Sequence, residues 1–273
     1  MPVLHADWLI PDWQAPAGVR AVFTTRAGGV SALPYDSMNL GDHVGDLPER
    51  VAANRTLLAD GIGRRPVFLK QVHGVDVALL DGNTPDGRVA DACISLQPGQ
   101  ACCIMVADCL PVLFATEDGQ AVAAAHAGWR GLAGADGTGV LESTYKHLIA
   151  TRQYGRAPAA IKIIAWLGPC IGPDAFEVGA EVKAAFESAQ PEAAGLFAPI
   201  AGTADKFLAD LPGLARLRLQ AMGVTAVYGN DGSPAWCTVG NPSRFFSHRR
   251  DAGPTGNGMG TTGRMAACIW IDE

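Results

Sequence analysis

The chain has 273 residues and a formal net charge of −6, and its 27 acidic and 21 basic residues are spread along its length, so no basic stripe favours nucleic acid as a partner. It has neither a secretory signal nor an unbroken run of the ~18 apolar residues that cross a membrane, so we expect a cytoplasmic protein. Its seven cysteines contain no C-x-x-C pair, which indicates thiols or metal ligands rather than disulfides.

Short apolar and β-branched runs predict strands along most of the chain. In chain order, the predicted strands are 19–24, 66–69, 75–80, 102–106, 112–115, 121–125, 161–167 and 265–271. Several of these runs are almost entirely apolar, which indicates sheets that are covered on both faces.

Four helices are predicted between the strands. The first covers residues 47–59, with Asp46 as its N-cap and Pro48 in its first turn, where the missing N–H costs nothing. The others cover 138–151, 178–189 and 204–222, and the last is interrupted at Pro212 and Gly213. Because residues 66–125 are almost all strand, the order favours an α+β fold with mixed sheets in a single domain over residues 1–273.

Three segments place a metal ligand at the end of a predicted strand. They are K-Q-V-H-G with His73, A-D-C with Cys109, and H-A-G-W-R-G with His126. These residues are much farther apart in the sequence than the ligands of a zinc finger. Two imidazoles and one thiolate leave one position of a tetrahedral zinc ion open, as catalytic sites do, and zinc lowers the pKa of a bound water to about 7. Taken singly, each histidine is better explained by a structural role.

The remaining cysteines and histidines have simpler interpretations. We expect Cys93, Cys102, Cys103, Cys237 and Cys268 to be inert packing residues. His5 and His43 are expected at the surface or in turns, and His147 on an exposed helix. Asp108 adjoins Cys109 and is a catalytic candidate, although an extended backbone would point its side chain away from the thiol.

Residues 245–251 read F-F-S-H-R-R-D. Aromatic rings, His248 and Arg249 could stack on a planar base and pair with an oxyanion, but the segment also fits an aromatic anchor beneath a solvated charged turn. The G-P-C-I-G segment at 168–172 indicates only a loop. Residues 258–263 match G-x-G-x-x-G but precede a strand, so they do not predict a dinucleotide site.

Together these segments resemble the YfiH-like family, which is also called the laccase-domain, polyphenol-oxidase or peptidoglycan-editing-factor family. The resemblance covers nearly the whole chain. Its further motifs are F-T-T-R-A-G-G-V-S from Phe23, Asn39-Leu40-Gly41, Asn54-Arg55 and Gly263-Arg264-Met265. It implies a four-layer α/β/β/α arrangement, and it places the zinc ligands at His73, Cys109 and His126.

The resemblance also implies an activity on purine nucleosides. Members are associated with phosphorolysis of adenosine, guanosine, inosine and methylthioadenosine, and with deamination of adenosine. Phosphorolysis requires a cationic pocket for phosphate and stabilisation of the departing base. For substrate and phosphate binding in a monomer we expect Lys70, Arg26, Asn39, His248 and Arg249. Arg55 is expected to join the catalytic residues.

Three other functions stay open. The first is a copper polyphenol oxidase, although six histidines are too few for a trinuclear cluster and a blue-copper centre, and copper bound in vitro could still support weak phenol oxidation. The second is a cysteine hydrolase with Cys109 as nucleophile and His126 or His73 as base. The third is a peptidoglycan-editing factor. The loop at 252–262 is longer than the resemblance leads us to expect and could alter substrate choice.

Overall fold

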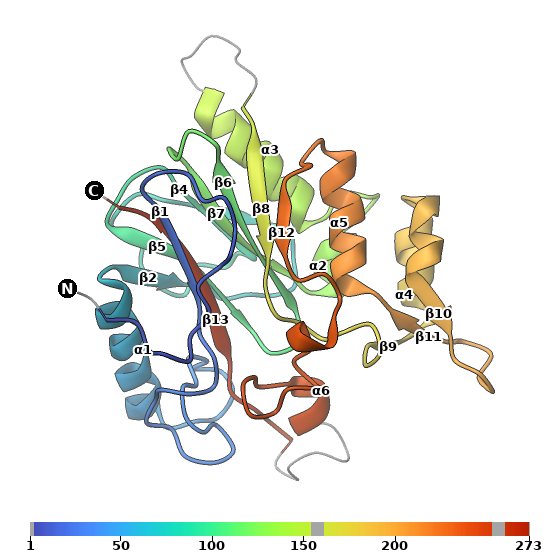
Figure 1. Ribbon diagram of the computed structural model, residues 1–273, viewed down its shortest axis with the longest axis horizontal. Coiled ribbons are helices and arrows are strands. Elements are labelled where there is room, and N and C mark those ends of the chain that lie inside the picture. Colours follow the sequence, from blue (N-terminus) through green and yellow to red (C-terminus); the bar gives the residue numbers. More distant parts are fainter. Residues whose placement is uncertain (1–2, 154–160, 253–259, 273) are drawn as a thin grey trace.

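The structure is a computed structural model that describes residues 3–153, 161–252 and 260–272, and it contains two large mixed β-sheets (Figure 1). The smaller one has the order β1-β13-β5-β2, in which β13 is antiparallel to both neighbours and β2 is parallel to β5. Its strands are β1 (Val19–Phe23), β2 (Arg65–Phe68), β5 (Gln100–Val106) and β13 (Met265–Ile271).

The larger sheet has the order β12-β8-β6-β7-β4-β3 and is parallel at its two edges and antiparallel between them. Its strands are β3 (Val77–Leu80), β4 (Ala92–Ser95), β6 (Leu110–Thr116), β7 (Val122–Ala127), β8 (Ile163–Leu167) and β12 (Val227–Gly229). Both sheets combine parallel and antiparallel pairs, so the predicted α+β class with mixed sheets is confirmed.

The two large sheets pack against each other and share one hydrophobic core. Because side chains alternate along a strand, Leu113 and Ala115 of β6 enter this core, whereas Val112 and Phe114 belong to the core on the opposite face. Every residue of β6 is therefore buried. This double covering explains the nearly continuous apolar run of the strand.

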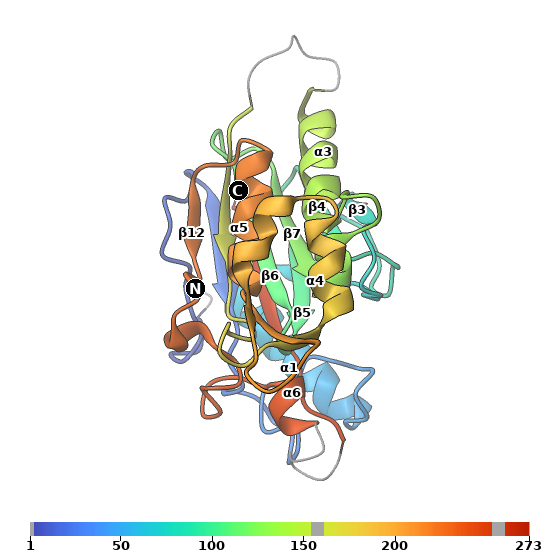
Figure 2. The ribbon, with the colours of Figure 1, turned by 90° about the vertical axis from the view of Figure 1, so that its right-hand side faces the viewer.

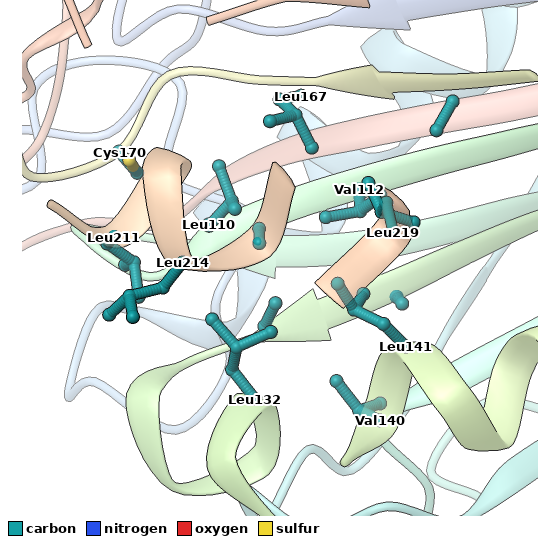
Figure 3. Packing of buried hydrophobic residues seen from close by; sticks show 14 of the residues in the cluster. Leu110, Val112, Leu132, Val140, Leu141, Leu167, Cys170, Leu211, Leu214 and Leu219 are labelled. Carbon is teal, nitrogen blue, oxygen red and sulfur yellow. The ribbon is translucent and has the colours of Figure 1, made fainter. Parts of the chain in front are cut away.

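Helices cover the outer face of the larger sheet, as the side view shows (Figure 2). They include α2 (Trp129–Ala133), α3 (Val140–Gln153) and α5 (Leu211–Ala221). Aliphatic side chains of these helices meet those of the sheet in Figure 3, which labels Leu132, Val140, Leu141, Leu214 and Leu219 against Leu110, Val112 and Leu167. Helix α2, which follows β7, packs on this core through Leu132 and Ala133.

Helix α1 (Pro48–Ile62) packs with the smaller sheet, where Leu58 and Ile62 join Cys103 and Cys268 in a separate core. A third, antiparallel sheet has the order β10-β11-β9. The α/β/β/α order implied by the resemblance contains two sheets, whereas this structure has a third sheet beside the two large ones. The four-layer order therefore stays a prediction. The remaining elements are β9 (Glu177–Gly179), α4 (Ala180–Glu187), η1 (Pro191–Leu196), β10 (Phe197–Pro199), β11 (Lys206–Ala209), η2 (Pro234–Trp236) and α6 (His248–Asp251).

All the predicted strands are present, with shifted ends, but two helix predictions are wrong at their starts. The first part of the region predicted as a helix over 204–222 forms β11, and α5 begins only at Leu211. Asp210 caps α5 by accepting a hydrogen bond from the backbone nitrogen of Gly213, and Pro212 is tolerated in the first turn. The helix predicted over 178–189 likewise follows strand β9 and begins at Ala180.

Asp46 does not cap α1 as predicted. Leu47 occupies the N-cap position without a side-chain hydrogen bond, and the Asp46 carboxylate instead accepts hydrogen bonds from Ser31 Oγ and Asn39 Nδ2. Residues 253–259, which include most of the 252–262 loop and the first two residues of the 258–263 glycine run, lie outside the described residues. None of the described helices is long and apolar enough to cross a membrane.

Candidate metal centre

The three predicted metal ligands come together where the two large sheets meet. His73 follows β2, Cys109 lies between β5 and β6, and His126 belongs to β7. Strand β5 is in the smaller sheet and β6 in the larger one, so the chain crosses between sheets at residues 107–109. Because β6 pairs with β7 immediately after this crossing, with Pro111 opposite His126, the thiol lies next to the imidazole.

His73, Cys109 and His126 form the triad, and their ligand atoms lie within 4.8 Å of one another. Cys109 Sγ is 3.6 Å from His73 Nε2, and the rings of His73 and His126 meet edge to face with centroids 4.7 Å apart. His126 is buried, Cys109 is half-buried and His73 is exposed. A Cβ atom at Gly128 would lie 2.7 Å from the His73 ring and 2.9 Å from Cys109 Sγ, so this close approach requires glycine.

The separation of Cys109 Sγ and His73 Nε2 fits a tetrahedral metal ion. Bonds of about 2.3 Å to sulfur and about 2.0–2.1 Å to nitrogen place the two ligand atoms about 3.5 Å apart at the tetrahedral angle. The observed separation of Cys109 Sγ and His73 Nε2 is 3.6 Å. Two imidazoles and a thiolate are also ligands that suit zinc, and three protein ligands leave a fourth position for water or substrate.

A buried carboxylate supports the triad from behind. Asp91 is fully buried and accepts a hydrogen bond from His126 Nδ1 at 2.9 Å. It also accepts hydrogen bonds from the backbone nitrogens of Val72, His73 and Gly74, at 3.1, 2.9 and 2.7 Å. The sequence motifs did not identify Asp91. A usable signal was its charge at the start of the otherwise apolar run 90–94.

The triad shifts the proton equilibria of its own members. Burial raises the pKa of the Cys109 thiol, but the charge of His126 and hydrogen bonds from both histidines outweigh burial and lower the pKa to about 6. Burial lowers the pKa of His126, whereas the Cys109 and Asp91 charges raise it to about 9. Burial also raises the pKa of Asp91, yet its bonds with His126 and Gly74 hold it below the usual value. Cys109 is therefore favoured as a thiolate, the form that binds metals.

The triad lies in the wall of a cavity of about 800 Å³. Apolar and aromatic side chains line part of it, among them Leu69, Val106, Trp129, Ile171, Phe176 and Leu211. Five cationic side chains line it as well, namely Arg55, Lys70, Arg130, Arg249 and Arg264. Such a mixture of apolar wall and charged groups suits a small ligand with a flat apolar part and an anionic part.

The cationic side chains differ in how far other groups already engage them. Arg55 is paired with Asp42 at 3.2 Å and donates to the carbonyl of Leu40, while Arg264 donates to the carbonyls of Thr262 and Gly263. The side chains of Lys70 and Arg130 are exposed and have no hydrogen-bond or ion-pair partner within the described part of the chain. The Arg130 guanidinium lies over the Trp129 ring, 4.4 Å from its centroid. The motifs did not single out Arg130 or Arg264 as site residues, although both lie in quoted motifs.

Two predicted substrate-binding residues do not line the cavity. The guanidinium of Arg26 donates to the carbonyls of Asp36 and Pro242 and pairs with the Asp36 carboxylate. Asn39 is fully buried, and its side chain accepts hydrogen bonds from the backbone nitrogens of Gly41 and Arg264. Both side chains hold loops together in this structure, because their polar groups are taken up by neighbouring backbone.

Asp108 and the short helix α6 close another side of the cavity. The backbone of Asp108 has φ +89° and is not extended, so its side chain is not directed as an extended strand would require. Its carboxylate accepts hydrogen bonds from Thr238 Oγ1 and from the backbone nitrogen of Arg249. His248 and Arg249 at the start of α6 both line the cavity.

The other cysteines and histidines lie mostly as expected. All seven cysteines are free thiols, and Cys93, Cys102, Cys103 and Cys268 are buried in the cores. Cys237 is only half-buried, and its sulfur accepts hydrogen bonds from the backbone nitrogens of Gly172 and Gly240. His147 is exposed on α3, as predicted. His43 is exposed in a turn but also lines the cavity.

Comparison with known proteins identifies relatives that match nearly the whole chain. The profile of the family described as multi-copper polyphenol oxidoreductase laccase matches residues 20–272. A Pseudomonas aeruginosa protein named purine nucleoside phosphorylase is 48% identical over 97% of this chain and 99% of its own. YfiH of Escherichia coli K12, which has the same name, is 46% identical over 96% and 98%.

Solved structures show the same relationship. A crystal structure of a Neisseria meningitidis protein is 45% identical, covers 98% of this chain and all of its own, and superposes with a TM-score of 0.82. That of YlmD from Geobacillus stearothermophilus is 31% identical, covers 94% and 93%, and has a TM-score of 0.75. The chain therefore belongs to the multi-copper polyphenol oxidoreductase laccase family, the family of the YfiH-like proteins.

Proposed function

We propose that the protein is a zinc-dependent purine nucleoside phosphorylase, built as one catalytic domain over residues 1–273 and active as a cytoplasmic monomer. One observation carries the proposal: His73, Cys109 and His126 bring their ligand atoms within 4.8 Å of one another in the wall of a cavity of about 800 Å³. The cavity has positive charge for phosphate and apolar wall for a nucleoside. The names of the relatives support the same activity.

Phosphorolysis requires the cavity to bind two groups, the phosphate and the purine nucleoside. A phosphate oxygen forms a bond to C1′ of the ribose, the bond from C1′ to the purine nitrogen breaks, and the base leaves with the electron pair and takes up a proton. We assign the phosphate to Lys70 and Arg130, with Arg249 beside them, because positive charge fixed in advance stabilises the anion without reorganisation. Trp129 and Phe176 supply aromatic surface on which a purine can stack.

The metal and its ligands form the third part of the proposed site. Zinc held by the triad supplies Lewis acidity and a position for an activated water. His126 is oriented by Asp91, and Cys109 is held as the thiolate by its two histidine neighbours. Copper also binds imidazole and thiolate, so copper loading in vitro is compatible with this ligand set.

The proposed substrates of phosphorolysis are adenosine, guanosine, inosine and methylthioadenosine. A second proposed activity is deamination of adenosine, in which water replaces the amino group at C6 and ammonia is released. The observation that favours it is the number of protein ligands, because three ligands leave one coordination position for water. Phosphate dependence separates the two reactions.

A cysteine hydrolase is the main rival for the same residues. Cys109 Sγ lies 3.6 Å from His73 Nε2, which is the arrangement of a thiol nucleophile and its base. A thiolate that holds zinc is not available for such attack. Zinc bound tightly at one ion per chain therefore favours the metalloenzyme, and protein isolated without metal but active as a thiol hydrolase favours the rival.

The test combines metal analysis with product analysis. Protein of known zinc content is incubated with adenosine, with and without phosphate, and products are separated by chromatography. Adenine and ribose 1-phosphate that appear only with phosphate support phosphorolysis, whereas inosine formed without phosphate supports deamination. Cys109→Ala gives the background, and Cys237→Ala is the matched control because Cys237 lies outside the triad. If the wild type forms no more product than the Cys109→Ala background, the proposal is contradicted.

A further inference from the structure

Asp91 joins two of the three metal-ligand segments. Its Oδ1 accepts hydrogen bonds from His126 Nδ1 and from the backbone nitrogen of His73, both at 2.9 Å. Its Oδ2 accepts from the backbone nitrogens of Val72 and Gly74, at 3.1 and 2.7 Å. Each carboxylate oxygen thus has two donors, and the whole side chain is buried.

These contacts decide which nitrogen of His126 can bind a metal. In a neutral imidazole, the form that binds a metal, a proton on Nδ1 that is donated to a carboxylate leaves Nε2 unprotonated and available as the ligand. The histidine is further held by its backbone nitrogen, which donates to the carbonyl of Asp91 at 2.7 Å. The side chain and the main chain of one residue therefore position His126 together.

The same carboxylate shapes the loop that carries His73. Three consecutive backbone nitrogens, from Val72 to Gly74, converge on Asp91, and His73 at the middle of this cradle has φ +60°. A residue other than glycine rarely adopts this conformation without support from its surroundings. Hydrogen bonds to an ionised carboxylate are about twice as strong as neutral ones, and they provide that support.

We propose that Asp91 is the positioning residue of the metal centre and assembles both histidine ligands before metal binds. The inference rests on the metal site of the proposed function, but it does not depend on the purine chemistry. Asp91 is not among the residues that line the cavity. It acts through His126 and through the loop of His73.

Asp91→Asn tests the proposal because it keeps the size of the side chain and removes one acceptor. In either orientation of the amide, its NH2 group faces two donors whose hydrogen bonds the carboxylate oxygen at that position had accepted, and both hydrogen bonds are lost. We expect the dissociation constant for zinc, measured by competition with a chromophoric chelator, to rise about 10–100-fold, which is typical for loss of such a supporting group. In the cobalt-substituted protein we expect altered d–d absorption bands.

Asp118→Asn is the matched control. Asp118 accepts hydrogen bonds from Thr116 Oγ1 and the backbone nitrogen of Gln120 and pairs with Arg152, in the turn between β6 and β7 and away from the triad. The zinc affinity and cobalt bands of the Asp118→Asn variant should match those of the wild type. Unchanged zinc affinity and cobalt bands in Asp91→Asn would overturn the role of Asp91, whereas a wild type that binds no zinc overturns the metal site itself.

A second measurement needs no variant and covers the case in which Asp91→Asn does not fold. In zinc-loaded wild type labelled with 15N at histidine, long-range 1H–15N spectra report the tautomer of each ring. We expect His126 to carry its proton on Nδ1 and to bind zinc through Nε2. Zinc coordination through Nδ1 of His126, or a proton on Nε2, would contradict the proposal.

Discussion

Asp108 accepts a hydrogen bond from the backbone nitrogen of Arg249 at 2.6 Å, across 141 positions of the sequence. The same carboxylate accepts a hydrogen bond of 2.5 Å from Oγ1 of the buried residue Thr238. Since Asp108 directly precedes Cys109, these two contacts attach α6 and its cavity-lining residues to the metal centre. Both carboxylate oxygens are thereby occupied, which favours a structural role for Asp108 over proton transfer.

Asp108→Asn and Asp108→Ala separate the two roles. The asparagine oxygen can still accept from the Arg249 nitrogen while its NH2 group donates to Thr238 Oγ1, so we expect less than about 1 kcal/mol of destabilisation and activity within about tenfold of wild type. Alanine removes both hydrogen bonds and should cost about 3 kcal/mol. Urea unfolding and steady-state kinetics measure the two effects. A stable but inactive asparagine variant would show that the ionised carboxylate takes part in the chemistry.

The reactivity of Cys109 should depend on pH in a way that reflects its neighbours. In metal-free protein we expect the rate of alkylation by iodoacetamide to rise with pH around a midpoint of about 6, because only the thiolate reacts. Mass spectrometry of the peptide that contains Cys109 follows this rate and separates it from that of Cys237. His126→Gln removes the positive charge and should move the midpoint up towards that of an ordinary thiol. Bound zinc should suppress the reaction, and a wild-type midpoint above about 8 contradicts the expected thiolate.

The cations of the cavity should differ from Arg26 in their effect on catalysis. For Lys70→Ala and Arg130→Ala we expect KM for phosphate to increase about 10–100-fold, because each variant loses a charge-assisted hydrogen bond to the anion. Arg26→Ala is the contrasting variant. Its guanidinium is bonded to Asp36 and to the carbonyl of Pro242, so its loss should lower thermal stability and leave KM for phosphate near the wild-type value. Phosphate titrations at saturating nucleoside decide the matter.

Copper binding tests the chemistry suggested by the family description. Within the described ranges of the chain, the metal-ligand groups are limited to the single set His73, Cys109 and His126, so we expect one copper ion per chain after loading and removal of excess metal. Elemental analysis and electron paramagnetic resonance measure the stoichiometry and type of copper. Four copper ions per chain, with the signals of a blue-copper centre and a coupled cluster, would contradict the single-metal site.

Local sequence patterns predicted eight of the thirteen strands in the described part of the chain, and the chemical type of the site. Nearly continuous apolar runs such as that of β6 predicted sheets covered on both faces, since each side chain of such a strand needs an apolar partner. The His73, Cys109 and His126 set was recognisable because thiolate and imidazole at strand ends are an unusual combination. The start of α5 was not, because residues 206–209 pair as β11 with β9 and β10, and this strand pairing overrides the local helical spacing just before the helix.

Only the tertiary structure decided which polar residues serve the cavity. Arg26, Arg55 and Arg130 are equivalent as residue types. Loop carbonyls engage the first and Asp42 pairs with the second, whereas the third lies over the Trp129 ring at the cavity wall. Asp91 is a single acidic residue at the start of a short strand, and its importance depends on donors from two other segments. Hydrogen-bond partners are set by where strands cross and pair, so the sequence alone determined the ligand chemistry, and the fold decided its support and its surroundings.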